Sequence, residues 1–257
     1  MTTPEVTTAE TATAETVTPE TATAETTTAA TTMEAATGGR SVLFVLTSHG
    51  ELGGTGRPTG FWLAEAAHPW EVFTGAGYRV DLASPLGGRS PIDGADPTDP
   101  VQRAFLDEVD LAAAVPLAGV DPAGYDAVLY VGGHGTMWDF PGNPDIVRIG
   151  DAVHTAGGVI AAVCHGPVGL LGLSAPDGTP LLAGRAVTCF TNDEERASQL
   201  AEVIPFFLQT TLTDRGARHS HAGVYAPHVV EDGRVVTGQN PSSAKGVAEA
   251  VVRLLKG

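Results

Sequence analysis

The sequence is poor in several residue types that mark particular classes of protein. Of its 257 residues only two are cysteine and 6% are aromatic, and 14 Lys and Arg stand against 30 Asp and Glu. Two cysteines exclude a disulfide framework in a chain of this size and favour a reduced, cytoplasmic protein. The formal net charge of −16 argues against nucleic acid or an anionic membrane surface as a partner. No apolar run is long enough to span a bilayer.

The first 39 residues lack almost everything that a folded core requires. Segment 1–39 has no aromatic residue, no Leu, no Ile and no basic residue, and Thr, Ala and Glu dominate it. Such a composition predicts a disordered tail, because it cannot bury enough apolar area to offset chain entropy. The segment also lacks the cationic start of a secretory signal and the Arg of a transit peptide. Met33 within it is a candidate alternative start, which mass spectrometry of the native protein would decide.

From residue 40 onward, short apolar runs alternate with helical patterns. Strands are expected at 41–47, 78–84, 126–133, 157–166 and 186–190. Helices are expected from Pro69 to about residue 74, at 98–109, 144–156 and 192–203, and from Ser242 or Ser243 to near the end. Near-continuous apolar runs indicate strands that are buried on both faces. The pattern predicts one α/β domain over 40–257, a three-layer, flavodoxin-like sandwich with a mostly parallel sheet.

Pro69 affects where the first of these helices is expected to begin. Proline suits the first position of a helix, where its missing N–H costs nothing. The residue before a proline avoids helical geometry. We therefore expect Glu65 to lie in a bend just before this helix.

The stretch AAVCHGPVGLL, residues 161–171, resembles a nucleophile elbow. Cys164 would lie at the carboxyl end of a buried strand, where open α/β sheets place their sites, with a helix beginning directly after it. The N-terminus of that helix is expected to lower the pKa of the thiol. The N–H of His165 and the backbone at Gly132 and Gly133 are candidate oxyanion donors. The alternative is that Cys164 is an unreactive residue packed in the core. We interpret the other cysteine, Cys189 in the apolar run VTCF, in this way.

Four segments together resemble a known superfamily: AAVCHGP, VGGHGTMWDFP, GFWLAEAAHPWEVF and VVTGQNPSSAKGVAEAVV. The pattern is similar to the class I glutamine-amidotransferase-like proteins, in the PfpI and Parkinson-disease-deglycase group. Within that group it is nearest to the chaperone-like, glutathione-independent glyoxalases, and it covers 40–257. The resemblance implies that Cys164 is the nucleophile, that His165 is its partner and that Glu65 is the acid beside the sulfur. It also implies that Gly133 and His165 donate the oxyanion hydrogen bonds, and it places His134 near the site in a substrate-binding or structural role.

The resemblance also implies an acidic partner for the histidine just after the fifth strand, which here is the stretch FTNDEERA. Spacing favours Glu195, with Asp193 and Glu194 as alternatives. The late histidines lack the His-x-Glu pattern of true glutamine amidotransferases, which argues against glutamine hydrolysis. His219 and His221, two residues apart, are a weak signal for zinc. We expect neither a metal nor an organic cofactor, because a thiolate and two proton-transfer groups suffice for the implied chemistry.

The activity that the resemblance implies is that of a cofactor-independent lyase of the glyoxalase III type. Methylglyoxal or another 2-oxoaldehyde would form a hemithioacetal with the cysteine and leave as a 2-hydroxy acid such as lactate. Such a protein would detoxify methylglyoxal in a stress response. A protein deglycase or a stress chaperone is the alternative, and a cysteine peptidase is less favoured. The resemblance also implies a homodimer.

Overall fold

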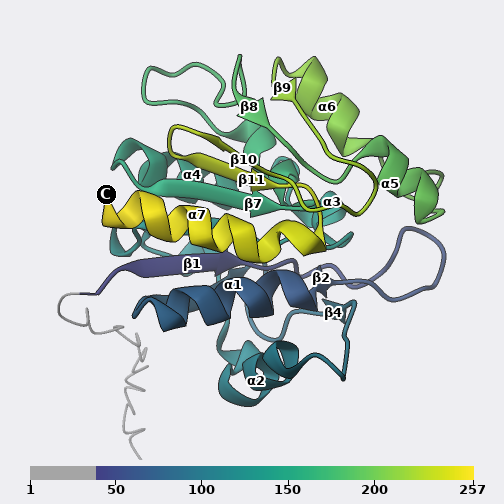
Figure 1. Ribbon diagram of the computed structural model, residues 1–257, viewed down its shortest axis with the longest axis horizontal. Helices are drawn as coiled ribbons and strands as arrows, with labels where there is room; N and C mark the ends of the chain where they lie inside the picture. Colours follow the sequence, from purple (N-terminus) through teal and green to yellow (C-terminus); the bar gives the residue numbers. More distant parts are fainter. Residues whose placement is uncertain (1–38) are drawn as a thin grey trace, which may run out of the picture. The chain divides into compact units, whose positions relative to one another are not determined.

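The computed structural model describes residues 39–257 (Figure 1). The predicted tail, apart from Gly39, and the candidate start at Met33 lie outside the described residues. None of the described helices is both long enough and apolar enough to cross a membrane.

A seven-stranded sheet forms the centre of the fold. Its strands lie in the order β10, β11, β7, β6, β1, β3, β5, and every neighbouring pair is parallel except β10 and β11. Their bounds are β1 Ser41–Val45, β3 Arg79–Ser84, β5 Val115–Pro116, β6 Ala127–Tyr130, β7 Val159–Val163, β10 Val229–Asp232 and β11 Val235–Gly238. The predicted mostly parallel sheet is confirmed. Sequence reasoning missed β5, β10 and β11, which are short or lie among polar residues.

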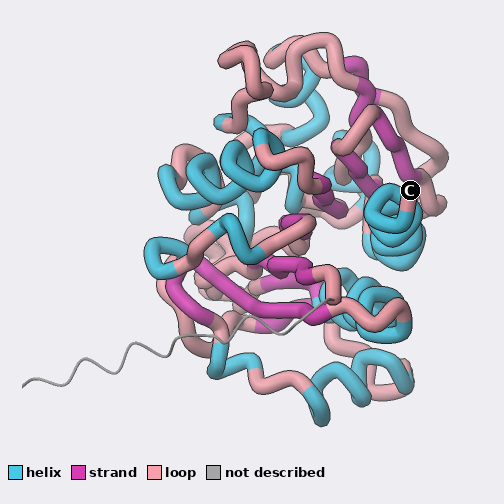
Figure 2. Tube along the Cα trace, turned by 90° about the vertical axis from the view of Figure 1, so that its left-hand side faces the viewer, coloured by secondary structure: helices cyan, strands magenta, loops and turns pink. Residues whose placement is uncertain are grey.

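Helices cover both faces of this sheet, and they give the three layers that the strand–helix alternation predicts. Helices α1 (Leu63–Gly75) and α7 (Ala244–Lys256) lie side by side on one face, and α2 (Pro100–Glu108) packs against α1 (Figure 1). Helix α4 (Pro144–Thr155) packs on β6 and β7 from the other face. The shorter helices are α3 (Thr136–Asp139), α5 (Asn192–Ala197) and α6 (Leu208–Asp214). Figure 2 shows the same helices and strands from the side.

Alternation along β1 shows why both layers are needed. Val42 and Phe44 pack with α1 and α7 in one core, whereas Leu43 and Val45 pack with α4 in the other. All four side chains are completely buried. Burial of each large apolar side chain contributes roughly 1.5–3 kcal/mol. A strand with two buried faces therefore has to be apolar throughout, which is the pattern that the sequence shows.

The prediction of a strand over 186–190 is wrong both in the length of the strand and in the sheet to which it belongs. Only Ala186–Val187 (β8) is a strand, and it pairs with β9 (Arg218–His219) in a separate two-stranded sheet. A second small sheet joins β2 (Phe61–Trp62) to β4 (Ile92–Asp93). The apolar run 186–190 is buried for another reason, because it passes beside the end of β7, where the Phe190 N–H donates to the Cys164 carbonyl at 2.9 Å.

The start of the first helix is also wrong. Helix α1 begins six residues before Pro69, so Glu65 lies in its first turn instead of in a bend. Proline inside a helix removes one hydrogen bond, here the bond to the carbonyl of residue 65, but the buried face of α1 compensates. That face includes Ala66, Ala67 and Phe73.

The other helical expectations had different outcomes. Helices α2 and α4 match their predictions, and α7 follows a short 3-10 turn over Pro241–Ser243. The helix expected at 192–203 ends at Ala197. The segment after Cys164 is a 3-10 helix, Gly166–Gly172, instead of an α-helix.

Candidate active site

Cys164 lies at the carboxyl end of β7 in a strained backbone conformation. Its φ is +60°, a left-handed value that costs a residue with a side chain of the order of 1–3 kcal/mol. The turn is tight, since a Cβ on Gly166 would lie 2.1 Å from the Tyr130 carbonyl oxygen. Backbone hydrogen bonds to neighbouring segments hold the cysteine in this turn: its N–H donates to Gly238 and its carbonyl accepts from Phe190, both at 2.9 Å. This geometry is that of a nucleophile elbow.

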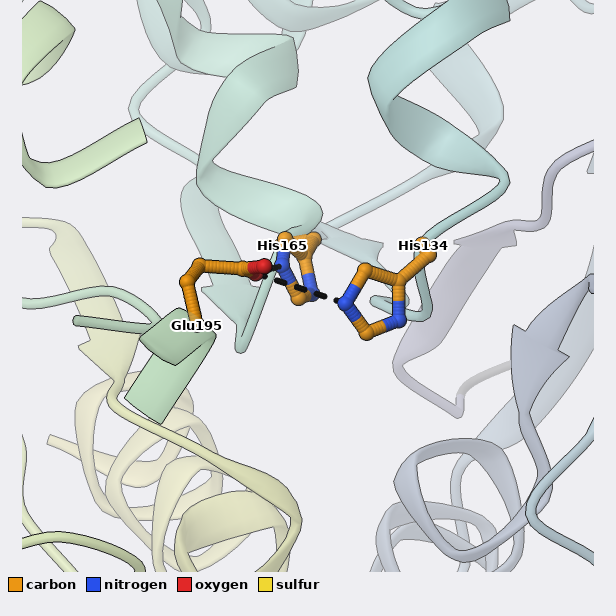
Figure 3. A group of neighbouring side chains, drawn as sticks. All are labelled: His134, His165 and Glu195. Carbon is orange, nitrogen blue, oxygen red and sulfur yellow. Dashed lines mark hydrogen bonds and ion pairs between the residues drawn. The ribbon is translucent and has the colours of Figure 1, made fainter. Parts of the chain in front are cut away.

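His165 links the cysteine to an acid on α5. Its Nδ1 lies 3.3 Å from the Cys164 Sγ. Its Nε2 is hydrogen-bonded to Oε1 of Glu195 (Figure 3). Burial, together with the neighbouring His134, lowers the pKa of His165, which favours the neutral imidazole. Burial opposes ionisation of Glu195, but the adjacent His134 and His165 side chains outweigh it and lower the pKa of Glu195 to about 2. The Cys164 thiol, the neutral His165 imidazole and the Glu195 carboxylate are therefore connected in series, with the imidazole in the middle.

The three consecutive acids of α5 have separate surroundings. Glu195 faces His165, whereas Asp193 is largely exposed and pairs with Arg196 at 2.8 Å. Glu194 is fully buried but turns toward other segments. Of the three candidates left open by spacing, Glu195 is the one that contacts the histidine.

Glu65 reaches the same place from the first turn of α1. It is completely buried, and neither carboxyl oxygen has a hydrogen-bond partner of good geometry within residues 39–257. Burial raises the pKa of Glu65 well above its usual value, while the adjacent Cys164 side chain and Gly132 backbone act in the opposite direction with less weight. Glu65 is thus held as a neutral carboxylic acid beside the thiol.

Gly132 leaves the space that this pairing requires. A Cβ there would lie 2.4 Å from Glu65 Oε2 and 2.9 Å from the Cys164 Cβ. Any side chain at this position would therefore push the acid and the cysteine apart.

The expectation of a lowered thiol pKa is wrong for this structure. Burial raises the pKa of Cys164 above that of an ordinary thiol. The cysteine is 4% exposed, and the segment after it is a 3-10 helix that offers less of an aligned dipole than the α-helix expected there. The thiol consequently needs a nearby base to become a nucleophile, and His165 Nδ1 is in that position.

Two backbone N–H groups are available beside the cysteine. Those of Gly133 and His165 make no hydrogen bond within the described part of the chain. Gly133 has a φ of +107°, and a Cβ there would lie 2.4 Å from the Gly60 carbonyl oxygen. Only glycine fits this close approach, which sets the direction of the Gly133 N–H.

His134 lies closer to the acid than sequence reasoning had placed it. Its Nε2 is 3.3 Å from Glu195 Oε1, and its ring centroid is 4.2 Å from that of His165 (Figure 3). Two imidazoles therefore share one carboxylate. A single histidine in a glycine-rich loop carries no signal of such a partner, so the sequence could not have revealed it.

Sequence reasoning missed Glu194 as an organising residue. Its carboxylate accepts hydrogen bonds of 2.8–2.9 Å from the backbone and hydroxyl of Thr191, the Tyr225 backbone, and the side chains of Gln239 and Asn240. These donors come from three segments, so Glu194 ties α5 to the loop at 222–226 and to the end of β11. The sequence did carry a signal for one of these contacts, because Thr191 and Glu194 have the spacing of a capping box.

Aromatic rings close one side of the site. The Phe190 ring lies 4.6 Å from the His165 ring and 6.3 Å from that of Tyr225. Tyr225 is 47% exposed and has a φ of +58°. The loop that carries Tyr225 is thus held in an unfavourable conformation beside the catalytic candidates.

The late histidines do not gather into a metal site. His219 Nε2 lies 3.6 Å from the Cys189 Sγ, and the rings of His219 and His221 are 5.8 Å apart. Within residues 39–257, the His, Cys, Asp and Glu side chains close enough to share an ion are instead His134, His165 and Glu195. Cys189 is completely buried, as the core interpretation predicts.

A strained cysteine, a following histidine and a carboxylate at the carboxyl edge of a doubly wound sheet define a class: cysteine-centred α/β proteins with a nucleophile elbow. Comparison with known proteins agrees at the level of family. The model of the DJ-1/PfpI family matches residues 58–254, and the chain belongs to this family.

Relatives match over nearly their whole length. Glyoxalase 3 of Candida albicans is 34% identical, with 82% of this chain and 96% of that protein covered. Glutathione-independent glyoxalase HSP31 of Saccharomyces cerevisiae is 31% identical, with 84% and 98% covered. The crystal structure of glyoxalase III from Candida albicans superposes with a TM-score of 0.78 at 33% identity, over 84% of this chain and 97% of that one.

Proposed function

We propose that this protein is a glutathione-independent glyoxalase that converts methylglyoxal and similar 2-oxoaldehydes to 2-hydroxy acids. One observation carries the proposal: the thiol of Cys164 lies between a neutral acid, Glu65, and a neutral base, His165, which Glu195 holds. Moving a proton between two adjacent carbons requires such a pair. The names of the relatives described above support the same activity.

In the first step, His165 Nδ1 takes the thiol proton and the sulfur attacks the aldehyde carbon, C1. The carbonyl π electrons move to the oxygen, where the N–H groups of Gly133 and His165 stabilise the negative charge. The protonated imidazole then returns its proton to that oxygen. The product is a hemithioacetal, and the imidazole is neutral again.

In the second step, the hydrogen on C1 moves to C2. His165 removes the C1 proton while Glu65 protonates the ketone oxygen on C2, which gives an enediol. His165 then delivers its proton to C2, and Glu65 recovers one from the C1 hydroxyl. Both groups end as they began, and C1 is now the carbonyl of a thioester.

In the third step, water attacks the thioester with His165 as general base. The C–S bond breaks, the sulfur takes up a proton, and the 2-hydroxy acid leaves. The sum is the addition of one water to the aldehyde with no net oxidation, so the scheme calls for no external oxidant or reductant.

The alternative activities differ in what they require. A deglycase would use the same residues on a protein-bound adduct. A chaperone would need a broad apolar surface, whereas the large hydrophobic side chains exposed within residues 39–257 are Leu86, Leu106, Val224 and Tyr225. A peptidase would need a groove for an extended chain, and none of the features described above indicates one.

The test measures D-lactate and L-lactate formed from methylglyoxal without glutathione, by the wild type, Cys164→Ala and Glu65→Gln. We expect the first substitution to lower turnover by a factor of about 10⁴ or more and the second by about 10²–10⁴. A wild type that makes no lactate, although its thiol is still alkylated, would contradict the proposal. Retained suppression of aggregation by Cys164→Ala would favour the chaperone.

We further propose that the protein acts as a homodimer in the cytoplasm. The sequence resemblance supports the dimer, and the two unpaired cysteines fit a reducing compartment. Light scattering of the purified chain tests the first point, and fractionation of cells that express it tests the second.

A further inference from the structure

Three buried side chains from separate elements meet beside the cysteine. His134 follows β6, His165 follows β7 and Glu195 lies on α5 (Figure 3). One ring nitrogen from each histidine and one carboxylate oxygen all lie within 4.8 Å of one another. The catalytic scheme uses His165 and Glu195 but gives no part to the ring of His134.

Two atoms of this group lack partners. His134 Nε2 and Glu195 Oε2 are buried and make no hydrogen bond of good geometry within the described residues. The side chains are 10% and 2% exposed, so bulk water does not compensate. Buried polar atoms are nearly always paired, and an exception calls for a ligand or an ordered water.

The spacing and the chemistry fit zinc. Ligands about 2.0–2.1 Å from a tetrahedral ion lie about 3.3 Å from one another, which equals the 3.3 Å between His134 Nε2 and Glu195 Oε1. Imidazole and carboxylate donors suit zinc, whereas magnesium and calcium prefer oxygen alone. The contact between His165 Nε2 and Glu195 Oε1 is shorter and has to lengthen when the ion enters.

We propose that His134, His165 and Glu195 form an inhibitory zinc site, with water as the fourth ligand. A Zn–N bond forms at His165 Nε2 and the N–H bond there breaks, while Nδ1 takes up a proton from the solvent. The ring therefore stays a neutral imidazole, and no group is oxidised or reduced. The Cys164 Sγ faces Nδ1, on the other edge of the ring, so the thiol is not a ligand. Zinc separates His165 from Glu195, and the ring proton now on Nδ1 leaves that atom unable to accept the thiol proton. This last point, the inhibition, rests on the proposed function.

The experiment is calorimetric titration of the full chain with Zn²⁺ at neutral pH. We expect one equivalent to bind to the wild type and equally to Cys164→Ala. Affinity should fall at least tenfold in His134→Ala and in Glu195→Gln. His221→Ala is the matched control, because it removes an exposed histidine of the other cluster and should leave binding unchanged.

Three results would overturn the site: no binding by the wild type at micromolar zinc, binding that disappears in Cys164→Ala, or binding that disappears in His221→Ala. Substitution of Co²⁺ into the wild type provides evidence that does not depend on whether a variant folds. A d–d spectrum of a tetrahedral ion without a thiolate charge-transfer band is expected, and a thiolate band would contradict the ligand set.

Binding and turnover are measured separately, so the two proposals can fail separately. One equivalent of zinc on the expected ligands without lactate formation would refute the glyoxalase and leave the site. Lactate formation that persists with zinc bound would refute the inhibition. If both proposals hold, turnover falls over the same zinc concentrations as binding, and a chelator restores it.

Discussion

Glu194 and Glu195 are neighbours on α5 and are buried almost equally, yet their surroundings differ. Glu194 accepts hydrogen bonds from the Thr191, Tyr225, Gln239 and Asn240 donors, and both of its oxygens are used. Glu195 shares one oxygen between two histidines and has no partner for the other within the described residues. A carboxylate whose bonds are all made by fixed groups holds structure together. One with unmet bonding and a titratable partner is available for chemistry.

Among the acids compared, the largest expected effect is on turnover, at Glu195. In Glu195→Gln the amide can no longer hold the neutral imidazole in the right tautomer, so we expect turnover of methylglyoxal to fall about 10³–10⁴-fold. Lactate formation under saturating substrate measures this. A loss of less than tenfold would remove Glu195 from the mechanism.

The second effect is on stability, at Glu194. Glu194→Gln turns an amide N–H₂ toward groups that are themselves donors, and we expect a loss of about 2–4 kcal/mol in the free energy of unfolding. Urea denaturation measures it. Turnover per folded molecule should fall much less than in Glu195→Gln, and equal losses in the two variants would erase the distinction drawn between them.

The third effect is the pH dependence of Glu195. Its pKa of about 2 in the folded protein is below the usual 4.5, so the carboxylate contributes about 3 kcal/mol above pH 4.5. That contribution is lost as the pH falls from about 4.5 through 2. The stability gap between the wild type and Glu195→Gln should therefore narrow over this range, as followed by urea denaturation at several pH values. A constant gap would argue against the lowered pKa.

The fourth effect has the opposite sign and belongs to Glu65. Because burial raises the pKa of Glu65 in the folded protein, the folded state binds more protons than the unfolded state above pH 4.5. Relative to Glu65→Gln, the wild type should lose up to about 1.4 kcal/mol per pH unit as the pH rises from 4.5 toward the folded pKa. The variant should thus turn over methylglyoxal much more slowly than the wild type but gain stability relative to it at neutral pH. Parallel stability curves for the two proteins would be evidence of an ordinary, ionised Glu65.

The smallest effect is expected at Asp193, which serves as the control for its two neighbours. Its side chain is 70% exposed, so Asp193→Asn should change the free energy of unfolding by less than about 0.5 kcal/mol. Turnover should be unchanged. A large change at this position would mean that burial does not explain the different roles of Asp193, Glu194 and Glu195.

The elbow was predictable because its requirements are local. A buried apolar strand, a cysteine at its end and small residues around the turn are all visible within AAVCHGP. Spacing also favoured Glu195 as the partner of His165, which is the contact that the structure shows. The start of α1 was not predictable, since Pro69 is a local signal for a helix start and only the packing of the helix against the sheet overrides it.

The sequence by itself determined the alternation of apolar strands and helices, and with it the parallel sheet and the position of Cys164 at a strand end. These depend on periodicity and on residues that are close in the chain. The tertiary structure alone decided that Glu65 is a neutral acid, that His134 shares Glu195 and that Glu194 joins three segments. The protonation and the hydrogen bonding of a buried polar group depend on which distant segments surround it. Local sequence patterns do not show which segments these are.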